Sequence, residues 1–255
     1  MKVRILPLII VPLLLLLFLT FFLAPILWMA VSSLQPQENL MREEYIFTFD
    51  NVFVNYIELF KSDKFLLALK NTTIISIAAT LFTIVISSFA AYAFSRFQFR
   101  GKSFSMFSVY SIQMGPAVTF LIPLFFIFRA LRLIDNIWAM ILAITTFTVP
   151  ISMWVMLGFF NGVPRELDES AFIDGCTRFQ AFRRVILPLA KPGMISACII
   201  TFISVWGEML IALPLALTKA TPLTVYASSF SGIYTTDFGG AAAVSVISIL
   251  PVVII

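Results

Sequence analysis

The segment from Pro164 to Gly193 reads PRELDESAFIDGCTRFQAFRRVILPLAKPG and holds four acidic and five basic residues. Long apolar runs precede and follow it, in a chain of 255 residues that is 60% hydrophobic and only 12% charged. Soluble domains carry about 25% charged residues. We therefore expect an all-α membrane protein in which this segment belongs to a loop outside the bilayer, called the 161–192 loop below.

The 161–192 loop has the pattern of two short helices joined by a glycine. Pro164 suits the first turn of a helix and Gly175 suits a C-terminal cap, with ten breaker-free residues between them. A second helix is predicted from about Arg178 to Val185, and we expect Pro188 and Pro192 to stop it. The loop is therefore predicted to fold along the membrane surface.

The first of these helices presents a small, acidic surface. Leu167, Ala171 and Asp174 share one face by their spacing, and Ser170 lies beside them. The second helix has an apolar stripe made of Phe179, Phe182 and Ile186. A plain connecting loop is the alternative, but connections are usually shorter and lack paired helix signals. We expect an element that docks another protein.

Six apolar segments outside this loop are long enough, or nearly so, to cross a bilayer. They lie at about 6–34, 65–94, 104–128, 137–160, 194–217 and 241–255. The sixth covers about 22 Å at the helical rise and is still apolar at Ile255, so we expect the natural chain to continue. The sequence predicts one transmembrane domain with six spans.

Basic residues predict the orientation of these spans. Ten Lys and Arg residues fall in the segments 1–5, 95–103 and 161–192. Six fall in the opposite segments 35–64, 129–136 and 218–240. Because cytoplasmic loops carry the excess of positive charge, the N-terminus and the 161–192 loop are predicted to be cytoplasmic, and the 35–64 loop external.

Glu208 is the single acidic residue inside a predicted span, two residues after Trp206. An ionisable residue at membrane depth is a candidate for a functional site. A carboxyl paired across a subunit interface is the structural alternative. Gly115, Pro116 and Pro123 interrupt the third span, and broken helices persist where they line a cavity. These five residues are the candidates for the translocation path or for gating.

The composition argues against several other classes of protein. There is no histidine, and the two cysteines are distant from any second cysteine, so neither a metal site nor a disulfide is predicted. The net charge of +4 comes without a basic stripe, which argues against nucleic-acid binding. No phosphate-binding glycine loop is present. We expect no catalytic residue, no metal and no cofactor in this chain.

The 161–192 loop resembles the EAA loop of permease subunits from binding-protein-dependent ABC importers. The matching residues are Glu169-Ser170-Ala171, Gly175 and Ile186-Leu187-Pro188, with Ser170 in place of the usual alanine. The segments 71–102, 122–125, 163–175 and 205–218 are similar to sugar-type permeases, with Gly207 where that family usually has asparagine. The chain is identified as resembling the smaller, maltose-type permease subunit.

This resemblance implies a type I ABC importer permease in a prokaryotic inner membrane. The partners implied are a second permease subunit, two cytoplasmic ATPase subunits that bind ATP and Mg²⁺, and an external solute-binding protein. Membrane lipid surrounds the complex, and the chain would form half of the pathway for a sugar. The coupling residues implied are Glu169, Ser170, Ala171, Asp174, Gly175, Phe179, Phe182, Leu187 and Pro188.

Two other functions compete with this interpretation. A stand-alone secondary transporter or channel using Glu208 remains the alternative, although it should have more than one charged residue at membrane depth. An intramembrane enzyme would need a nucleophile–base pair or a metal cluster, and the sequence suggests neither.

Overall fold

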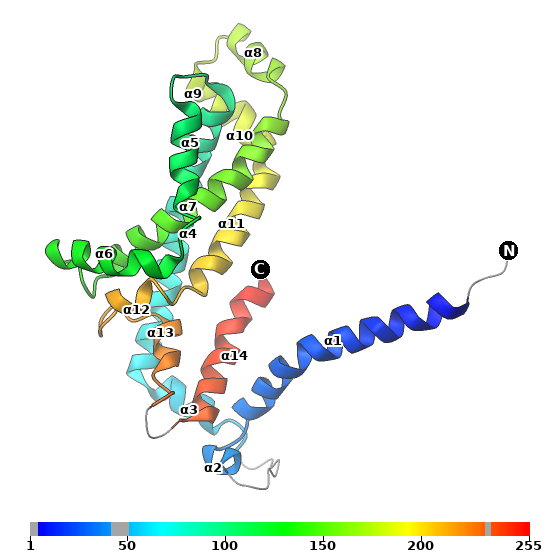
Figure 1. Ribbon diagram of the computed structural model, residues 1–255, viewed down its shortest axis with the longest axis vertical. Coiled ribbons are helices and arrows are strands. Elements are labelled where there is room, and N and C mark those ends of the chain that lie inside the picture. Colours follow the sequence, from blue (N-terminus) through cyan, green and yellow to red (C-terminus); the bar gives the residue numbers. More distant parts are fainter. Residues whose placement is uncertain (1–4, 42–50, 233–235) are drawn as a thin grey trace. The chain divides into compact units, whose positions relative to one another are not determined.

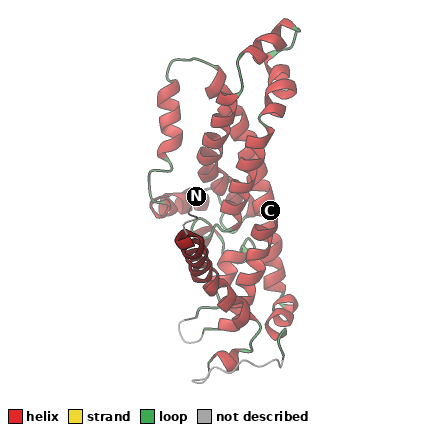
Figure 2. Ribbon diagram, turned by 90° about the vertical axis from the view of Figure 1, so that its right-hand side faces the viewer, coloured by secondary structure: helices red, strands yellow, loops and turns green. Residues whose placement is uncertain are grey.

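The computed structural model describes residues 5–41, 51–232 and 236–255, and side chains from Val11 onward. The described segments are helices joined by loops, with one isolated β-bridge between Ser231 and Thr236 (Figures 1 and 2). The predicted all-α class is therefore confirmed. The chain forms two compact units, one from Met1–Leu66 with Tyr226–Ile255 and the other from Leu67–Val225.

The first unit contains the N-terminal and C-terminal helices. Its elements are α1 (Ile5–Ser33), α2 (Gln37–Leu40), α3 (Val54–Lys61), the first turn of α4 (Asp63–Arg96) and α14 (Phe238–Ile254). α1 packs against α14. The Asn55 side chain donates hydrogen bonds to the carbonyls of Ser33 and Gln35, both at 2.9 Å, and so fixes α3 to the end of α1.

The second unit is built on three long helices. They are α4, α7 (Ile137–Gly162) and α11 (Lys191–Trp206). The shorter elements are α5 (Lys102–Ser111), α6 (Ala117–Ala130), α8 (Glu166–Ile173), α9 (Arg178–Ala181), a π-helical segment (Phe182–Ile186), α10 (Leu187–Leu189), α12 (Ala212–Leu215) and α13 (Leu223–Ser228), the last of which runs into the first unit. α7 packs closely on α11.

Three described helical stretches are long and apolar enough to cross a membrane. They are Val11–Ser33, Asp63–Arg96 and Ile137–Gly162, which match the first, second and fourth predicted spans. A fourth span results if Arg178–Leu189 and Lys191–Trp206, which meet at a 75° bend, count as one. α6 and α14 are apolar but shorter. The prediction of six spans is thus not reproduced helix by helix.

The predicted third span, 104–128, is two helices rather than one. α5 ends at Ser111 and α6 begins at Ala117, after Pro116 in an extended conformation with φ −62° and ψ 131°. Proline lacks an N–H and clashes with the preceding turn, which explains the break at this point. Pro123, also expected to interrupt the span, lies inside α6.

The predicted fifth span, 194–217, is also shorter than expected. α11 ends at Trp206, and Gly207 is its C-cap. The Glu208 carboxylate then accepts a hydrogen bond from the Ile211 N–H at 3.0 Å, just before the four-residue helix α12. A side chain that satisfies a backbone donor outside the helix favours a turn over a further helical turn.

The 161–192 loop confirms the predicted cap at Gly175, which has φ 82°. The N–H of Gly175 donates to the Phe172 carbonyl at 3.1 Å, and that of Cys176 to the Ala171 carbonyl at 2.9 Å. These two bonds are the Schellman arrangement that ends α8. The helix therefore stops where only glycine adopts the backbone conformation without strain.

The second helix of the loop continues past its predicted end. Thr177 and Gln180 form a capping box that starts α9. The helix then passes through the π-helical segment and α10 to Leu189, so Pro188 does not stop it. π-type turns next to a proline re-satisfy the backbone groups that the proline leaves unpaired. The chain bends only at Ala190, before Pro192 in the first turn of α11.

Candidate functional site

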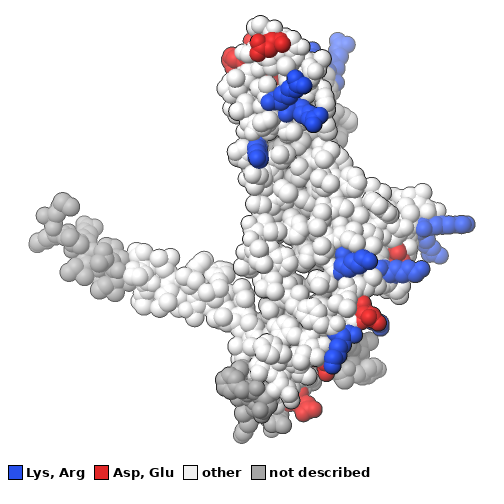
Figure 3. All heavy atoms as spheres, turned by 180° about the vertical axis from the view of Figure 1, so that it is seen from behind, with Lys and Arg blue, Asp and Glu red and all other residues white. Residues whose placement is uncertain are grey.

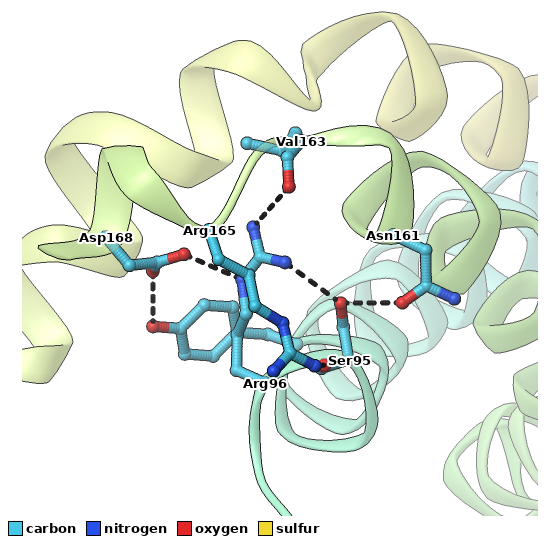
Figure 4. A network of polar contacts seen from close by, with 7 residues as sticks. Ser95, Arg96, Asn161, Val163, Arg165 and Asp168 are labelled. Carbon is cyan, nitrogen blue, oxygen red and sulfur yellow. Dashed lines mark hydrogen bonds and ion pairs between the residues drawn. The ribbon is translucent and has the colours of Figure 1, made fainter.

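A buried ion pair anchors the 161–192 loop to the end of α4. Arg96 Nε lies 2.8 Å from Asp168 Oδ2, and each side chain is only 9% exposed (Figure 4). The Tyr92 hydroxyl donates to Asp168 Oδ1 at 3.3 Å. Two charges removed from water in this way need one another, because either one alone would be buried without compensation. α8 is therefore held to α4 on its inner face.

Hydrogen bonds extend this anchor to the end of α7. Arg96 Nη2 donates to the Val163 carbonyl at 3.0 Å, and Arg165 Nη2 donates to the Ser95 carbonyl at 3.3 Å. The Ser95 hydroxyl donates to Asn161 Oδ1 at 2.8 Å. Figure 4 shows these groups converging between the three helices. The last turns of α4 and α7 and the start of α8 thus form one polar junction.

An aromatic layer lies beside the junction. The rings of Tyr92 and Phe182 have centroids 4.7 Å apart, and Phe182 also contacts Phe160 at 6.2 Å. The Arg178 guanidinium lies 5.1 Å above the Phe97 ring, a cation–π contact. The first residue of α9 and the first residue of the π-helical segment are thereby packed against α4 and α7.

α8 carries exposed apolar and acidic residues, of which Glu169 and Phe172 line a cavity beside the anchor. Ile173 is 86% exposed, Phe172 is 43% exposed and Leu167 is 37% exposed. Glu169 and Asp174 are exposed with them. Figure 3 shows charged side chains of both signs gathered where this loop lies. With about 3.6 residues per turn, these three apolar side chains are spread around α8, and Ile173, at its last position, is by far the most exposed.

The structure divides the predicted coupling residues into two groups. Exposed on the loop are Glu169, Ser170, Asp174, Gly175, Phe179 and Pro188, and Leu187 is half-buried. Ala171 and Phe182 are buried, at 5% and 4% exposure, and pack within the chain instead. α8 buries Asp168 and Ala171 within the chain. Of the face predicted for docking, Leu167 and Asp174 are exposed and Ala171 is buried.

Sequence reasoning missed the anchor itself. In the sequence, Arg96 is only one of the basic residues of segment 95–103 that predict orientation, and Asp168 is only one of the four acidic residues of the loop. The sequence does mark both residues as candidates for an ion pair. Arg96 follows a long apolar segment, and Asp168 shares a helical face with the small residue Ala171 three positions later. Such a signal names candidates but cannot pair residues that are 72 positions apart.

The second predicted group is partly brought together. Gly115 and Glu208 line one cavity of about 180 Å³. The other lining residues are Ile112, Gln113, Ala117, Phe147, Thr148, Ile151, Thr201, Ser204 and Ile211. Trp206 is buried and stacks on Phe202, outside this lining. Pro116 and Pro123 do not line the cavity either.

A third polar arrangement, which was not predicted, holds the loop before Ala220. The Asp135 carboxylate accepts hydrogen bonds from four successive backbone N–H groups, those of residues 217–220, at 2.9–3.1 Å. The Thr218 hydroxyl donates to it as well, at 2.9 Å. Burial raises the pKa of this carboxyl, but the hydrogen bonds outweigh burial and hold the pKa well below its usual range.

No three His, Cys, Asp or Glu side chains gather into a possible metal site anywhere in the described ranges. Among its described residues, the second unit thus has three polar arrangements. They are the anchor of Arg96 and Asp168, the cavity lined by Gly115 and Glu208, and the Asp135 carboxylate with its bonds to residues 217–220, called the Asp135 clamp below. The anchor fixes the inner face of α8, and the cavity lies where two helices are broken.

Comparison with known proteins identifies the family. Residues 83–255 match the family described as binding-protein-dependent transport system inner membrane component. The chain is 35% identical to the trehalose transport system permease protein SugB of Mycobacterium tuberculosis, over 91% of this chain and 85% of that protein. It is 31% identical to the trehalose/maltose transport system permease protein MalG of Thermococcus litoralis, over 91% and 84%.

A solved structure shows the same fold. It is that of a bacterial ABC transporter involved in the import of the acidic polysaccharide alginate. The TM-score is 0.82 at 23% identity, over 96% of this chain and 92% of that chain. The predicted ABC importer permease fold is confirmed, and so is the inner membrane location. The chain belongs to the family of binding-protein-dependent transport system inner membrane components, the permease subunits of ABC importers.

Proposed function

We propose that this chain is a permease subunit of an ATP-driven sugar importer, and that the 161–192 loop couples it to a cytoplasmic ATPase subunit. Support for the sugar comes from the trehalose and maltose permeases that the chain resembles over nine-tenths of its length. One observation carries the coupling. α8 exposes an apolar tip at Ile173 while its opposite face is fixed by the buried pair of Arg96 and Asp168.

The anchor explains how a push on α8 would reach the membrane. A partner bound to the tip moves α8, and the Arg96–Asp168 pair passes this movement to α4. The bonds of Arg96 to Val163 and of Ser95 to Asn161 pass it to α7. Because the linked groups are buried and paired, they move as one body rather than slide. ATP and Mg²⁺ would be bound by the ATPase partner.

The remaining partners follow from the family and from a solved relative. The family is dependent on a binding protein by its description. The structure of a bacterial alginate ABC transporter in complex with an alginate pentasaccharide-bound periplasmic protein has the same fold, with a TM-score of 0.73. We infer an external solute-binding protein for this chain too, and a second permease subunit that completes the pathway.

Affinity capture from detergent-solubilised membranes tests the coupling surface. The variant is Ile173→Lys, because a basic residue at the end of α8 suits the helix dipole while it removes the apolar tip. The matched control is Leu189→Lys, which also replaces an exposed apolar residue of the same loop, in α10. Mass spectrometry of the captured complex measures the ATPase and the second permease subunit.

We expect Ile173→Lys to lose the ATPase and keep the second permease, and Leu189→Lys to keep both. Retention of the ATPase by both variants would place the docking surface elsewhere. Absence of any ATPase from the wild-type complex would contradict the coupling itself.

A further inference from the structure

We propose that the 112–211 cavity, lined by Gly115, Gln113, Thr201, Ser204 and Glu208 among others, is a site at which this chain itself contacts the solute, and that the solute is an uncharged sugar. The inference rests on the proposed function, and it adds a contact site and a class of substrate. Four observations support it.

Two breaks in apolar helices meet at this cavity. One is the turn between α5 and α6, and the other is the turn between α11 and α12. Residues from both turns line the same space, Gly115 from the first and Glu208 from the second. Irregular backbone within a bilayer is tolerated only where it is buried in protein or lines a water-filled cavity. The two breaks line one cavity, which is the second of these two situations.

Polar side chains in the cavity wall point to the same conclusion. Gln113 and Ser204 are exposed, and Gln113 Nε2 donates to the Phe147 carbonyl at 2.6 Å, which leaves its amide oxygen without a described partner. Ser204 belongs to α11, which has no charged residue after Lys191. Exposed polar side chains at membrane depth face the interior of a bundle or a cavity rather than lipid.

Thr201 has a hydroxyl that lacks a partner. The residue is 1% exposed, and its Oγ1 has no hydrogen bond to any residue in the described ranges. A buried hydroxyl left without a partner costs about 1–3 kcal/mol. Its neighbour Ser204 satisfies its own hydroxyl at the Ile200 carbonyl, at 2.8 Å. Thr201 is thus ready to bond a group that enters the cavity.

The chemistry of the lining selects the class of solute. The described lining residues include hydroxyls, the Gln113 amide, the Phe147 ring and the Glu208 carboxylate, and none is Lys or Arg. The carboxyl oxygens can accept hydrogen bonds from the hydroxyls of a neutral sugar, and the lining hydroxyls can accept or donate them, whereas no cation in the described lining could pair with an anionic sugar. The geometry favours an uncharged polyhydroxylated solute.

The size of the cavity indicates a partial site. Its volume of about 180 Å³ is smaller than the roughly 300–1,000 Å³ of complete small-molecule pockets. It would hold one part of the solute, and the second permease subunit would contact the rest. Alternatively, the second permease subunit covers the cavity and seals its polar side chains away from water. Cysteine labelling at position 204 distinguishes these two arrangements.

A pair of matched threonine variants tests the contact. Thr201→Val removes the unpartnered hydroxyl of the cavity. Thr145→Val removes another buried hydroxyl without a described partner, in α7 and outside the cavity. Neither change breaks a described hydrogen bond, so both proteins should assemble like wild type. Uptake by cells is measured with radiolabelled trehalose, maltose and diacetylchitobiose as neutral probes, and an alginate tetrasaccharide as the anionic probe.

We expect Thr201→Val to raise the half-saturating concentration of the imported neutral sugar about three- to tenfold, the effect of one lost hydrogen bond. Thr145→Val should leave it unchanged. Equal values for both variants and wild type would overturn the contact and leave the importer function standing. Import of the anionic probe alone would overturn the class of solute. Import of no probe would overturn the proposed sugar transport, and this inference with it.

Cysteine labelling provides a readout that is independent of transport. Ser204→Cys is compared with Ser196→Cys, another α11 serine whose hydroxyl bonds the carbonyl four residues before it. Both are made in a chain with Cys176 and Cys198 replaced by serine. In the assembled complex, a water-soluble thiosulfonate reagent should modify position 204 faster than position 196, and the imported sugar should slow only the former. No modification at position 204 would overturn the proposal, because the cavity would then be sealed.

Discussion

The anchor beneath the 161–192 loop and the 112–211 cavity are both polar, yet their polar groups are used in opposite ways. In the anchor, Asp168 is paired with Arg96 and also accepts a hydrogen bond from the Tyr92 hydroxyl. In the cavity, Thr201 is buried without a described partner. A paired set of groups rigidifies a junction, and an unpaired one is suited to a ligand. This difference is the basis of the two proposals, a coupling joint at the anchor and a solute contact in the cavity.

Breaking the anchor should have the largest effect on stability. Arg96→Ala leaves Asp168 as an unpaired buried charge, and Asp168→Ala does the same to Arg96. Each single change should lower the free energy of unfolding by about 3–5 kcal/mol. Thermal unfolding of the purified chain in detergent, followed by circular dichroism, measures the loss.

The double variant Arg96→Ala with Asp168→Ala separates the pair from its parts. Because both charges are removed together, its loss should be smaller than the sum of the two single losses. Simple additivity would show that the two side chains act independently. A complex of the double variant that keeps its ATPase but imports slowly would assign the joint a role in transmission.

Sequence patterns predicted the features that depend on local chemistry. The spans at 6–34, 65–94 and 137–160 reappear as α1, α4 and α7, because an apolar run long enough to cross a bilayer satisfies its own backbone only as a helix. Gly175 was predicted as a cap because the left-handed conformation that ends α8 suits glycine. Each of these inferences needed only neighbouring residues.

The features that sequence patterns missed depend on residues distant in the chain. Asp135 meets the N–H groups of residues 217–220 across more than 80 positions, and no periodicity encodes that contact. The early end of α11 was missed because Gly207 reads as a tolerated residue inside an apolar run. Pro188 was expected to stop a helix that a π-helical segment allows to continue.

The Asp135 clamp is a second set of paired polar groups, like the anchor. Its carboxylate accepts hydrogen bonds from backbone N–H groups, whereas Asp168 in the anchor pairs with a cation. Asp135→Asn should destabilise the chain by about 2 kcal/mol at neutral pH, since hydrogen bonds to a charged acceptor are the stronger kind. Asp174→Asn is the matched control, because that exposed carboxyl accepts no described hydrogen bond of this kind. Unfolding temperatures in detergent measure both.

The pH dependence of this loss has a defined sign. The pKa of Asp135 lies below its unfolded value, so the clamp contributes its full stability above about pH 4, near the unfolded pKa. The contribution disappears as the pH falls through the lower, folded pKa. The difference between wild type and Asp135→Asn should therefore be constant above pH 5 and shrink in acid. A difference that grows in acid would contradict the clamp.

Substitution of Gly193 tests the packing between α11 and α7. Gly193 lies in the first turn of α11, and Phe159 lies in α7. A Cβ at position 193 would clash with Phe159 Cγ and would lie 2.6 Å from its Cβ. Gly193→Ala should cost up to about 3 kcal/mol, because the contact involves the base of the ring and not a mobile tip. Adding Phe159→Ala should recover part of the loss in the same unfolding assay, and no recovery would place the strain elsewhere.

Substitution of Gly175 should lower the free energy of unfolding least. It tests backbone strain alone, because a new Cβ there would meet no other atom of the chain. Its φ of 82° is left-handed, yet a Cβ there meets no atom within 4 Å. Gly175→Ala should therefore cost only about 1–2 kcal/mol, the strain of that conformation, and Gly175→Asn less, because asparagine tolerates it. If a partner lies against this cap in the assembled importer, Gly175→Asn should weaken ATPase capture more than its small effect on unfolding explains. Equal losses in the two assays would show instead that the glycine serves only to end α8.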